Sequence, residues 1–215
     1  SLWAQGRVNS TFSRYSRVRS MTGMTGAEAA RRLLNAQGIY DVTVQQIAGE
    51  LTDHYDPRTK TVNLSQSVYG ATSVAAIGVA AHECGHAMQD NEGYAPLRFR
   101  SALVPVANFG SSLSWPLILL GLVFGGLGSP LVEIGILMFS LAVLFQLVTL
   151  PVEYNASARA VRLLDAQGIL AGEEVNGTRK VLNAAALTYV AAAATSILQL
   201  LRLIILFGGR NRRDR

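Results

Sequence analysis

Two of the three histidines in the chain have a spacing that is typical of metal-binding helices. His82 and His86 are four residues apart, and Glu83 directly follows the first of them, which gives the string H-E-x-x-H. On an α-helix, positions four apart lie about 40° from each other around the axis, so both imidazoles face the same way. The spacing therefore predicts a metal ion shared by His82 and His86.

Glu83 has a different position on the same predicted helix. It lies about 100° around the axis from His82, beside a shared metal rather than on it, where its carboxylate can polarise a water. The alternative is that His82 and His86 are ordinary polar residues on a buried helix. Because the chain has so few histidines, we favour zinc ligation by His82 and His86, with Glu83 as general base.

The composition indicates an integral membrane protein. Half of the 215 residues are hydrophobic, only 15% are charged, and the mean hydropathy is +0.28. Residues 101–132 and 134–152 carry no charge, and each run is long enough to cross a bilayer. The glycine-rich stretch 125–130 predicts a tight turn, so these two runs should form an antiparallel hairpin. A third apolar run, 181–201, reaches on to Phe207.

Shorter patterns predict the structure of the remaining segments. Residues 1–20 are polar and basic without a clear period, so we expect an interfacial or linking segment. A capping box, Thr25 with Glu28, predicts a helix that ends at Gly38. Alternating residues before the motif predict a small antiparallel β-sheet, which could hold an extended substrate or simply pack against the motif helix.

These observations predict a mainly α membrane protein with five segments along the chain. They are a basic N-terminal segment with the H-E-x-x-H region (1–100), a transmembrane hairpin (101–150), a juxtamembrane helix with a third zinc ligand (151–183), a third transmembrane helix (184–208) and a basic tail (209–215).

The third zinc ligand is predicted from topology. A catalytic zinc site has three protein ligands. His54 is the one remaining histidine, and Asp90 and Glu92 follow His86 too closely to reach back without strain. Glu153 is the first acidic residue after the hairpin has returned the chain to the side of the motif. Glu153 also follows Pro151 at an expected helix start, where the helix dipole alone would attract a carboxylate, but beside H-E-x-x-H we favour ligation.

Three strings resemble a known family, the YugP-type membrane zinc metallopeptidases. They are LTDHYDPRTKTVNLS (51–65), AAIGVAAHECGHAMQD (75–90) and LPVEYNASARA (150–160), in this order. The resemblance covers most of the chain and implies a zincin-like helical core with about three membrane helices. It implies zinc held by His82, His86 and Glu153, and it matches Glu83 to the general base. Family members usually begin with a further hydrophobic helix, of which Leu2 could be the end.

The expected reaction is endoproteolytic hydrolysis of a peptide bond. Zinc lowers the pKa of a water towards about 7, and Glu83 takes up its proton. His54, Tyr55 and Tyr189 are the candidates for stabilising the oxyanion or contacting substrate, and the sequence does not choose among them. Asn155, Ser157 and Arg159 could orient the ligands from behind, although Arg159 could instead pair with an acidic neighbour.

A different class of function remains open, namely a membrane scaffold or complex-assembly protein with a structural or vestigial zinc site. The partners expected are a peptide or protein substrate, the lipid bilayer and a larger membrane complex, but no nucleic acid. We expect an integral protein of a bacterial-type plasma membrane, and the positive-inside rule favours the cytoplasmic side for the active site. The basic residues on the metal side are Arg98, Arg100, Arg159, Arg162, Arg179 and Lys180.

Overall fold

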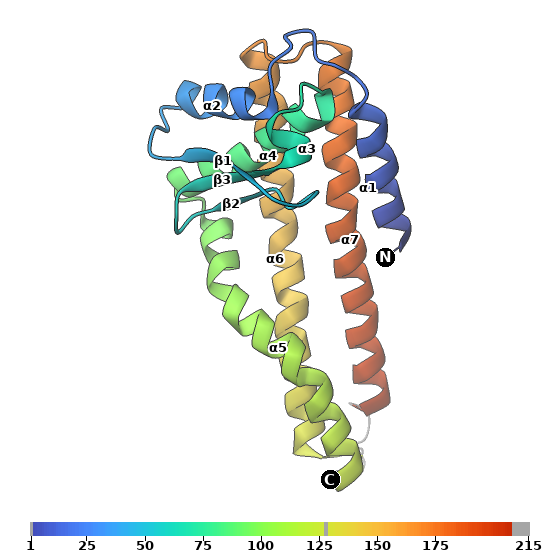
Figure 1. The fold of residues 1–215 in the computed structure, drawn as a ribbon. Coiled ribbons are helices and arrows are strands. Elements are labelled where there is room, and N and C mark those ends of the chain that lie inside the picture. The colour runs from blue at the N-terminus through green and yellow to red at the C-terminus, as the bar shows by residue number, and fades with distance from the viewer. Residues whose placement is uncertain (1, 127–128, 208–215) are drawn as a thin grey trace. The chain divides into compact units, whose positions relative to one another are not determined.

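The computed structural model describes residues 2–126 and 129–207, and these are mainly α-helical (Figure 1). The predicted fold class, a mainly α chain with three candidate membrane helices and a small sheet, is confirmed. The helices are α1 (Leu2–Tyr15), α2 (Gly26–Ala36), α3 (Gln66–Tyr69), α4 (Val74–Asn91), α5 (Ala95–Gly125), α6 (Pro130–Ala166) and α7 (Glu173–Phe207), and the strands are β1 (Thr43–Ile47), β2 (His54–Asp56) and β3 (Thr61–Ser65).

The chain divides into two compact units. The first contains the described residues up to Leu97 together with Val152–Thr188, and the second contains Arg98–Pro151 and the described residues from Tyr189 onward. The core of the first unit is formed by the buried faces of α2 and α4, the strand β3, and buried residues of α6 and α7. The motif helix α4 is therefore surrounded by the elements that could position a site.

Capping residues fix both ends of α2 and the start of α4. The predicted capping box is confirmed, because Thr25 Oγ1 accepts a hydrogen bond from the Glu28 amide and the Glu28 side chain accepts one from the Thr25 amide. Gly38 follows α2 with a φ of 69°, as expected for a residue that ends a helix. Ser73 caps α4 by accepting from the Ala76 amide.

The sheet is small and mixed, with β1, β3 and β2 lying side by side in that order (Figure 1). The prediction of an antiparallel sheet is wrong for β1, which pairs with β3 in parallel, whereas β2 pairs with β3 antiparallel. Residues 57–60 make the turn between β2 and β3, as the Asp56–Thr59 sequence predicted, but no such turn follows β1. After β1 the chain crosses to the opposite edge of the sheet and forms β2 there. β3 then lies between β1 and β2, and all five of its residues are buried.

Residues 2–15, within the segment expected to be interfacial or linking, form the helix α1. Few of its side chains are buried. Ala4 is fully buried, and Phe12 and Tyr15 pack against the core of the first unit. A Cβ atom at Gly177 in α7 would lie 2.7 Å from the Tyr15 ring, so α1 and α7 approach closely.

Three helices, α5, α6 and α7, are long and apolar enough to cross a membrane. Within the second unit, α5 and α6 pack through small residues, as is common between membrane helices. A Cβ atom at Gly110 would lie 2.6 Å from the Met138 carbonyl oxygen, and one at Gly135 would lie 2.8 Å from that of Ser114. Of the predicted turn, 127–128 lie outside the described residues, as does the predicted basic tail 209–215.

Glu153 lies well inside α6, which runs without a break from Pro130 to Ala166. The prediction that a helix begins just after Pro151 is therefore wrong. A proline removes one backbone hydrogen bond and can bend a helix, but ending a helix in an apolar setting would leave more backbone groups unpaired. Because Glu153 is not at a helix start, the helix dipole gives no reason for a carboxylate there.

Candidate metal centre

The H-E-x-x-H motif lies on α4 in the first unit, as its spacing predicted. His82 and His86 project from successive turns, with ring centroids 4.7 Å apart and an angle of 83° between the ring planes. His86 is buried and His82 is partly exposed. The two imidazoles are therefore close enough to bind one ion, with one edge of the pair open to solvent.

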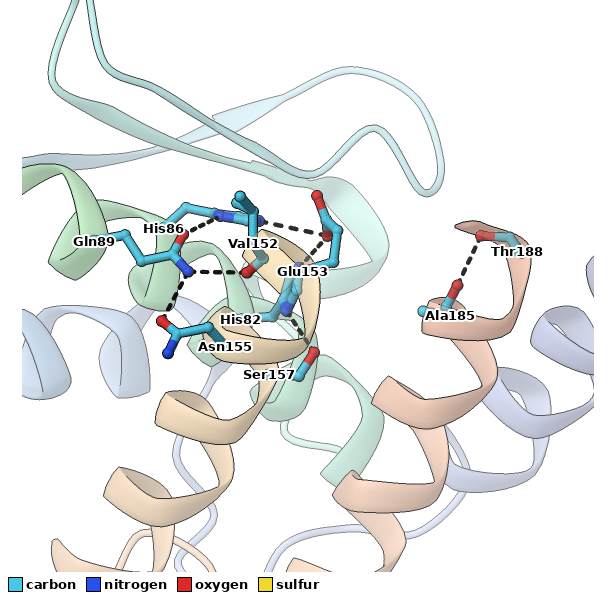
Figure 2. Close-up of polar contacts among 9 residues, drawn as sticks. All are labelled: His82, His86, Gln89, Val152, Glu153, Asn155, Ser157, Ala185 and Thr188. Atoms are coloured by element: carbon cyan, nitrogen blue, oxygen red, sulfur yellow. Dashed lines mark hydrogen bonds and ion pairs between the residues drawn. The ribbon is translucent and has the colours of Figure 1, made fainter. Parts of the chain in front are cut away.

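Glu153 of α6 completes a group of three ligand-type side chains (Figure 2). Its Oε2 atom lies 3.2 Å from His82 Nε2 and 3.6 Å from His86 Nε2. One ligand-type atom from each of the three residues lies within 4.8 Å of the others, and no other such group was found among residues 2–126 and 129–207. Both Nε2 atoms face the same carboxylate oxygen, so the three donors converge on one point.

Gly85, inside the motif, lets α4 and α6 approach at this point. A Cβ atom on Gly85 would lie 2.6 Å from the Ala156 carbonyl oxygen, and Ala156 is fully buried three residues after Glu153. Both contacting groups belong to backbones, so neither could move away as a flexible side chain could. A glycine at this position is therefore required for Glu153 to lie beside the two histidines.

Gln89 fixes the orientation and the tautomer of His86. Its Nε2 donates hydrogen bonds to the Val152 carbonyl and to Asn155 Oδ1, both at 2.9 Å. Its Oε1 therefore faces His86 Nδ1, at 3.0 Å (Figure 2). Because this oxygen only accepts, Nδ1 carries the hydrogen and the lone pair of the neutral ring is on Nε2, towards Glu153.

The same contacts continue from Asn155 to the surface. Arg159 Nε donates to Asn155 Oδ1 at 2.7 Å, and Arg159 Nη1 donates to Glu92 Oε1 at 2.6 Å. Arg159 thus both pairs with an acidic neighbour and supports Asn155, the two alternatives considered from the sequence. The Glu92–Arg159 pair, Asn155 and Gln89 form a continuous hydrogen-bonded chain that ends at His86.

His82 has a simpler partner. Ser157 Oγ, one helical turn after Glu153 on α6, lies 3.1 Å from His82 Nδ1. A hydroxyl can donate or accept, so this contact holds the ring without fixing which nitrogen carries the hydrogen. When Nε2 binds a cation, Nδ1 donates and Ser157 accepts.

The electrostatic surroundings favour a cation between the imidazoles. Burial alone would lower the pKa of His86, but hydrogen bonding to Glu153 and the negative charges of Glu83 and Glu153 outweigh it. The pKa of His86 is therefore raised above its ordinary value. In the absence of a metal, a proton on the imidazole provides the positive charge that the carboxylates favour.

Glu83, which directly follows His82 on α4, is buried, with 7% of its surface exposed. Within the described part of the chain, no hydrogen bond or ion pair engages its carboxylate, in contrast to that of Glu153. A carboxylate without a partner beside a cation site can accept a proton from a bound reactant.

The candidates for oxyanion stabilisation have other contacts. His54 and Tyr55 lie on the edge strand β2. His54 lies within hydrogen-bond distance of the Thr52 carbonyl and Asn63, and the Tyr55 hydroxyl donates to Asp90 at 2.8 Å. Burial and the neighbouring Asp90 raise the pKa of Tyr55. Tyr189 belongs to the second unit. The structure thus does not bring His54 or Tyr55 into the three-ligand group, and their roles stay predictions.

The single cysteine, Cys84, faces the opposite side of α4 from the histidines. It is fully buried, and its thiol lies 3.6 Å from the Ala30 carbonyl oxygen of α2. Burial raises the pKa of Cys84, so the thiol stays protonated and packs as a small apolar group.

A comparison with known proteins extends these observations to the whole chain. The model of the family described as "Putative neutral zinc metallopeptidase" matches residues 1–208. The chain belongs to this family. It is also 50% identical over 207 residues to the "Putative membrane protease YugP" of Bacillus subtilis (strain 168), which covers 96% of this chain and 91% of that protein. No solved structure matches the chain.

The family's name implies zinc, and the donor set of this chain fits that metal. Two imidazole nitrogens and one carboxylate oxygen are the ligands of a common class of catalytic zinc site, which leaves one position open for water. Hydrogen-bonded partners behind both imidazoles, Gln89 and Ser157, are also typical of zinc sites. The resemblance to zinc metallopeptidases that the sequence indicated is therefore confirmed at the level of the family.

Gln89 is a residue of this candidate metal centre that the sequence analysis missed. The signal was present, because Gln89 follows His86 by three residues and side chains at this spacing meet on a helix. What the sequence could not indicate is the second half of the contact. The Val152 carbonyl and Asn155 come from α6, and only the packing of α6 against α4 orients the Gln89 amide.

Proposed function

We propose that this chain is a membrane-embedded, zinc-dependent endopeptidase in which His82, His86 and Glu153 hold the metal. The observation that carries the proposal is the convergence of His82 Nε2, His86 Nε2 and Glu153 Oε2 beside a buried carboxylate, Glu83, that has no partner among the described residues. A zinc site that served structure alone would have no use for Glu83.

Each residue of the site has a role in this reaction. Zinc, when bound, supplies a Lewis acid that lowers the pKa of water towards about 7. Glu83 accepts a proton from the attacking water and passes it to the leaving amine. Gln89 and Ser157 hold the two imidazoles with Nε2 directed at the site. His54, Tyr55 and Tyr189 remain the candidates for binding the carbonyl oxygen as it gains charge.

The edge strand β2 offers a means of holding substrate. In the described sheet β2 pairs with β3 on one side only, so an extended peptide could add to its other edge. The expected substrates are accordingly unfolded or extended segments of peptides and proteins.

Substitution of Glu83 by glutamine tests the catalytic role. The amide has almost the same shape but cannot accept the proton, so cleavage of an unstructured protein such as casein should fall by about 10²-fold or more. Zinc content, measured by atomic emission on the same samples, should stay at the wild-type level. Undiminished cleavage would exclude Glu83 as general base, and a wild-type protein that binds zinc without cleaving would favour the scaffold function.

The membrane arrangement is part of the same proposal. The hairpin 101–150 and the run 184–208 would span a plasma membrane, with the metal centre on the cytoplasmic side. An Asn91→Cys variant can test the side, since Asn91 is exposed and native Cys84 is buried. Maleimide reagents that cannot cross membranes should label it only in inverted vesicles. Labelling in intact cells would reverse the orientation without affecting the proposed chemistry.

A further inference from the structure

A basic cavity lies in the first unit among α1, α6 and α7, apart from the three-ligand group. Its volume is about 750 Å³, and none of its described lining residues is acidic. The cations and hydrogen-bonding side chains that line it are Arg7, Ser10, Thr11, Arg14, Tyr15, Tyr154, Lys180 and Asn183. Three positive charges and five neutral hydrogen-bonding groups around one cavity are the chemistry that binds a phosphate group.

The three cations of this cavity are not neutralised by the protein. Across residues 2–126 and 129–207, no carboxylate lies within 4.0 Å of the side-chain nitrogens of Arg7, Arg14 or Lys180. Elsewhere in the same unit Lys60 pairs with Asp41 and Asp90. A bound anion would relieve the mutual repulsion of the three cations.

The position of the cavity along the chain indicates a lipid anion. Lys180 is the last charged residue before the uncharged run 181–201 of α7, and Leu187 within that run also lines the cavity. Tyr154 lines it from α6, two residues after the uncharged run 134–152 ends. The lining residues thus lie where one apolar segment begins and another ends, which is where a phospholipid has its phosphate and its first acyl carbons.

The helix α1 also carries residues that suit the surface of a membrane. Leu2 and Trp3 at its start are 94% and 66% exposed, while Arg7 and Arg14 further along line the cavity. An exposed apolar end followed by basic residues is typical of helices that lie at a membrane surface. A soluble phosphate or nucleotide would have no use for these apolar side chains.

We propose that this cavity is a binding site for the headgroup phosphate of an anionic phospholipid. Arg7, Arg14 and Lys180 supply the charge, Ser10, Thr11 and Asn183 supply hydrogen bonds, and the acyl chains follow the apolar run that begins after Lys180. Tyr154, which lines the cavity, directly follows Glu153 of the candidate metal centre on α6. The proposal does not depend on the enzymatic function or on bound metal.

Native mass spectrometry of residues 1–215 in an uncharged detergent tests this site. The wild type should bind phosphatidylglycerol more tightly than phosphatidylcholine, and the double variant Arg14→Gln/Lys180→Gln should lose about thirty-fold in phosphatidylglycerol affinity. The charge-matched control Arg17→Gln/Arg58→Gln removes two exposed cations outside the cavity lining and should retain it. Equal losses in the two double variants would overturn the proposal, as would equal affinity of the wild type for both lipids.

Further measurements distinguish a lipid phosphate from other sources of the anion. Inorganic phosphate at millimolar concentration should not displace phosphatidylglycerol, and displacement would assign the cavity to a free phosphate instead. An acidic peptide that binds the wild type but not the double variant, while phosphatidylglycerol binds both, would assign it to protein. Should the double variant not fold, Lys180→Gln alone should lose about five-fold, and Lys180→Arg should restore binding. Unchanged affinity in Lys180→Gln would likewise refute the site.

Discussion

The regions around the two histidines of the motif differ in how firmly they hold the imidazole. Behind His86 lies a hydrogen-bonded chain from Gln89 through Asn155 and Arg159 to Glu92, in which each donor and acceptor is fixed by the next. Behind His82 lies one hydroxyl, that of Ser157, which is free to rotate. The first region determines a tautomer, and the second only restrains a ring.

This difference has a consequence for the metal site. His86 is buried and cannot exchange its partner for water, so an unsatisfied Nδ1 would be costly. His82 is partly exposed, and water can replace a lost hydroxyl. Zinc binding through the buried His86 should therefore depend strongly on its supporting residues, and zinc binding through the partly exposed His82 only weakly. Both histidines present Nε2 to the centre.

Removal of the ligand shared by both regions should have the largest effect. In Glu153→Ala, His82 and His86 lose their common acceptor, and zinc affinity should fall more than 100-fold, beyond the roughly 10–100-fold seen for supporting residues. Zinc content of the purified protein measures this. Glu133→Ala, an exposed glutamate on the same helix α6, is the control and should bind zinc normally. Normal occupancy in Glu153→Ala would eliminate this residue as a ligand.

Acid should release zinc at a higher pH than it would from a site with ordinary histidines. Zinc binds the neutral imidazole, and the pKa of His86 is raised because its hydrogen bond to Glu153 and nearby carboxylates outweigh burial. The proton therefore competes with zinc up to a higher pH than at an ordinary histidine. As pH falls below this raised pKa, affinity should drop about tenfold per unit for each proton that zinc must displace. Titration with a competing chelator between about pH 8 and pH 6 measures this drop in zinc affinity. A zinc affinity that does not change over this range would contradict the prediction.

The support of His86 should have the next largest effect. Gln89→Leu keeps the approximate size of the side chain but removes both the acceptor for His86 and the donor to Val152 and Asn155. Zinc affinity should decrease by about 10–100-fold. Gln37→Leu, at an exposed position after α2, controls for the general effect of the substitution and should leave zinc affinity unchanged.

The support of His82 should matter less. Ser157→Ala removes one neutral hydrogen bond at a partly exposed ring, worth about 1 kcal/mol, so zinc affinity should decrease only about five-fold. Ser140→Ala is the matched control, because its hydroxyl donates only within α6, to the Ile136 carbonyl. A loss in Ser157→Ala as large as that in Gln89→Leu would remove the contrast between the two regions.

The parts of this site that could be predicted from the sequence are those that depend on local spacing and on charge. His82, Glu83 and His86 follow from helical periodicity, and the apolar runs follow from the absence of charge over lengths that suit a bilayer. Chain topology predicts Glu153 as the third ligand and the family resemblance implies the same residue, although the helix expected to begin there is interior to α6.

The parts that could not be predicted depend on contacts between distant segments. The role of Gly85 exists only because Ala156 of α6 passes within contact distance, and nothing near Gly85 in sequence indicates this. The helix α1 relies on packing of Phe12 and Tyr15 against the core rather than on an apolar period. The parallel pairing of β1 follows from the path of the chain across the sheet edge, which residue types alone leave undetermined.

The smallest effect on zinc affinity should come from Glu92, at the outer end of the hydrogen-bonded residues behind His86. Glu92 is 52% exposed at its side chain, and an exposed ion pair contributes about 0–1 kcal/mol. Glu92→Gln should therefore reduce zinc affinity less than about threefold, since Arg159 can still donate to Asn155 and water can solvate its free end. Arg159→Gln removes the donor to Asn155 as well and should lie between Glu92→Gln and Gln89→Leu. Chelator competition on the three variants gives the order. Glu92→Gln could instead weaken zinc binding as much as Gln89→Leu does. The hydrogen-bonded residues from Glu92 to Gln89 would then act as one cooperative unit, and the Glu92–Arg159 pair at the surface, rather than the buried Gln89 amide, would hold His86 in place.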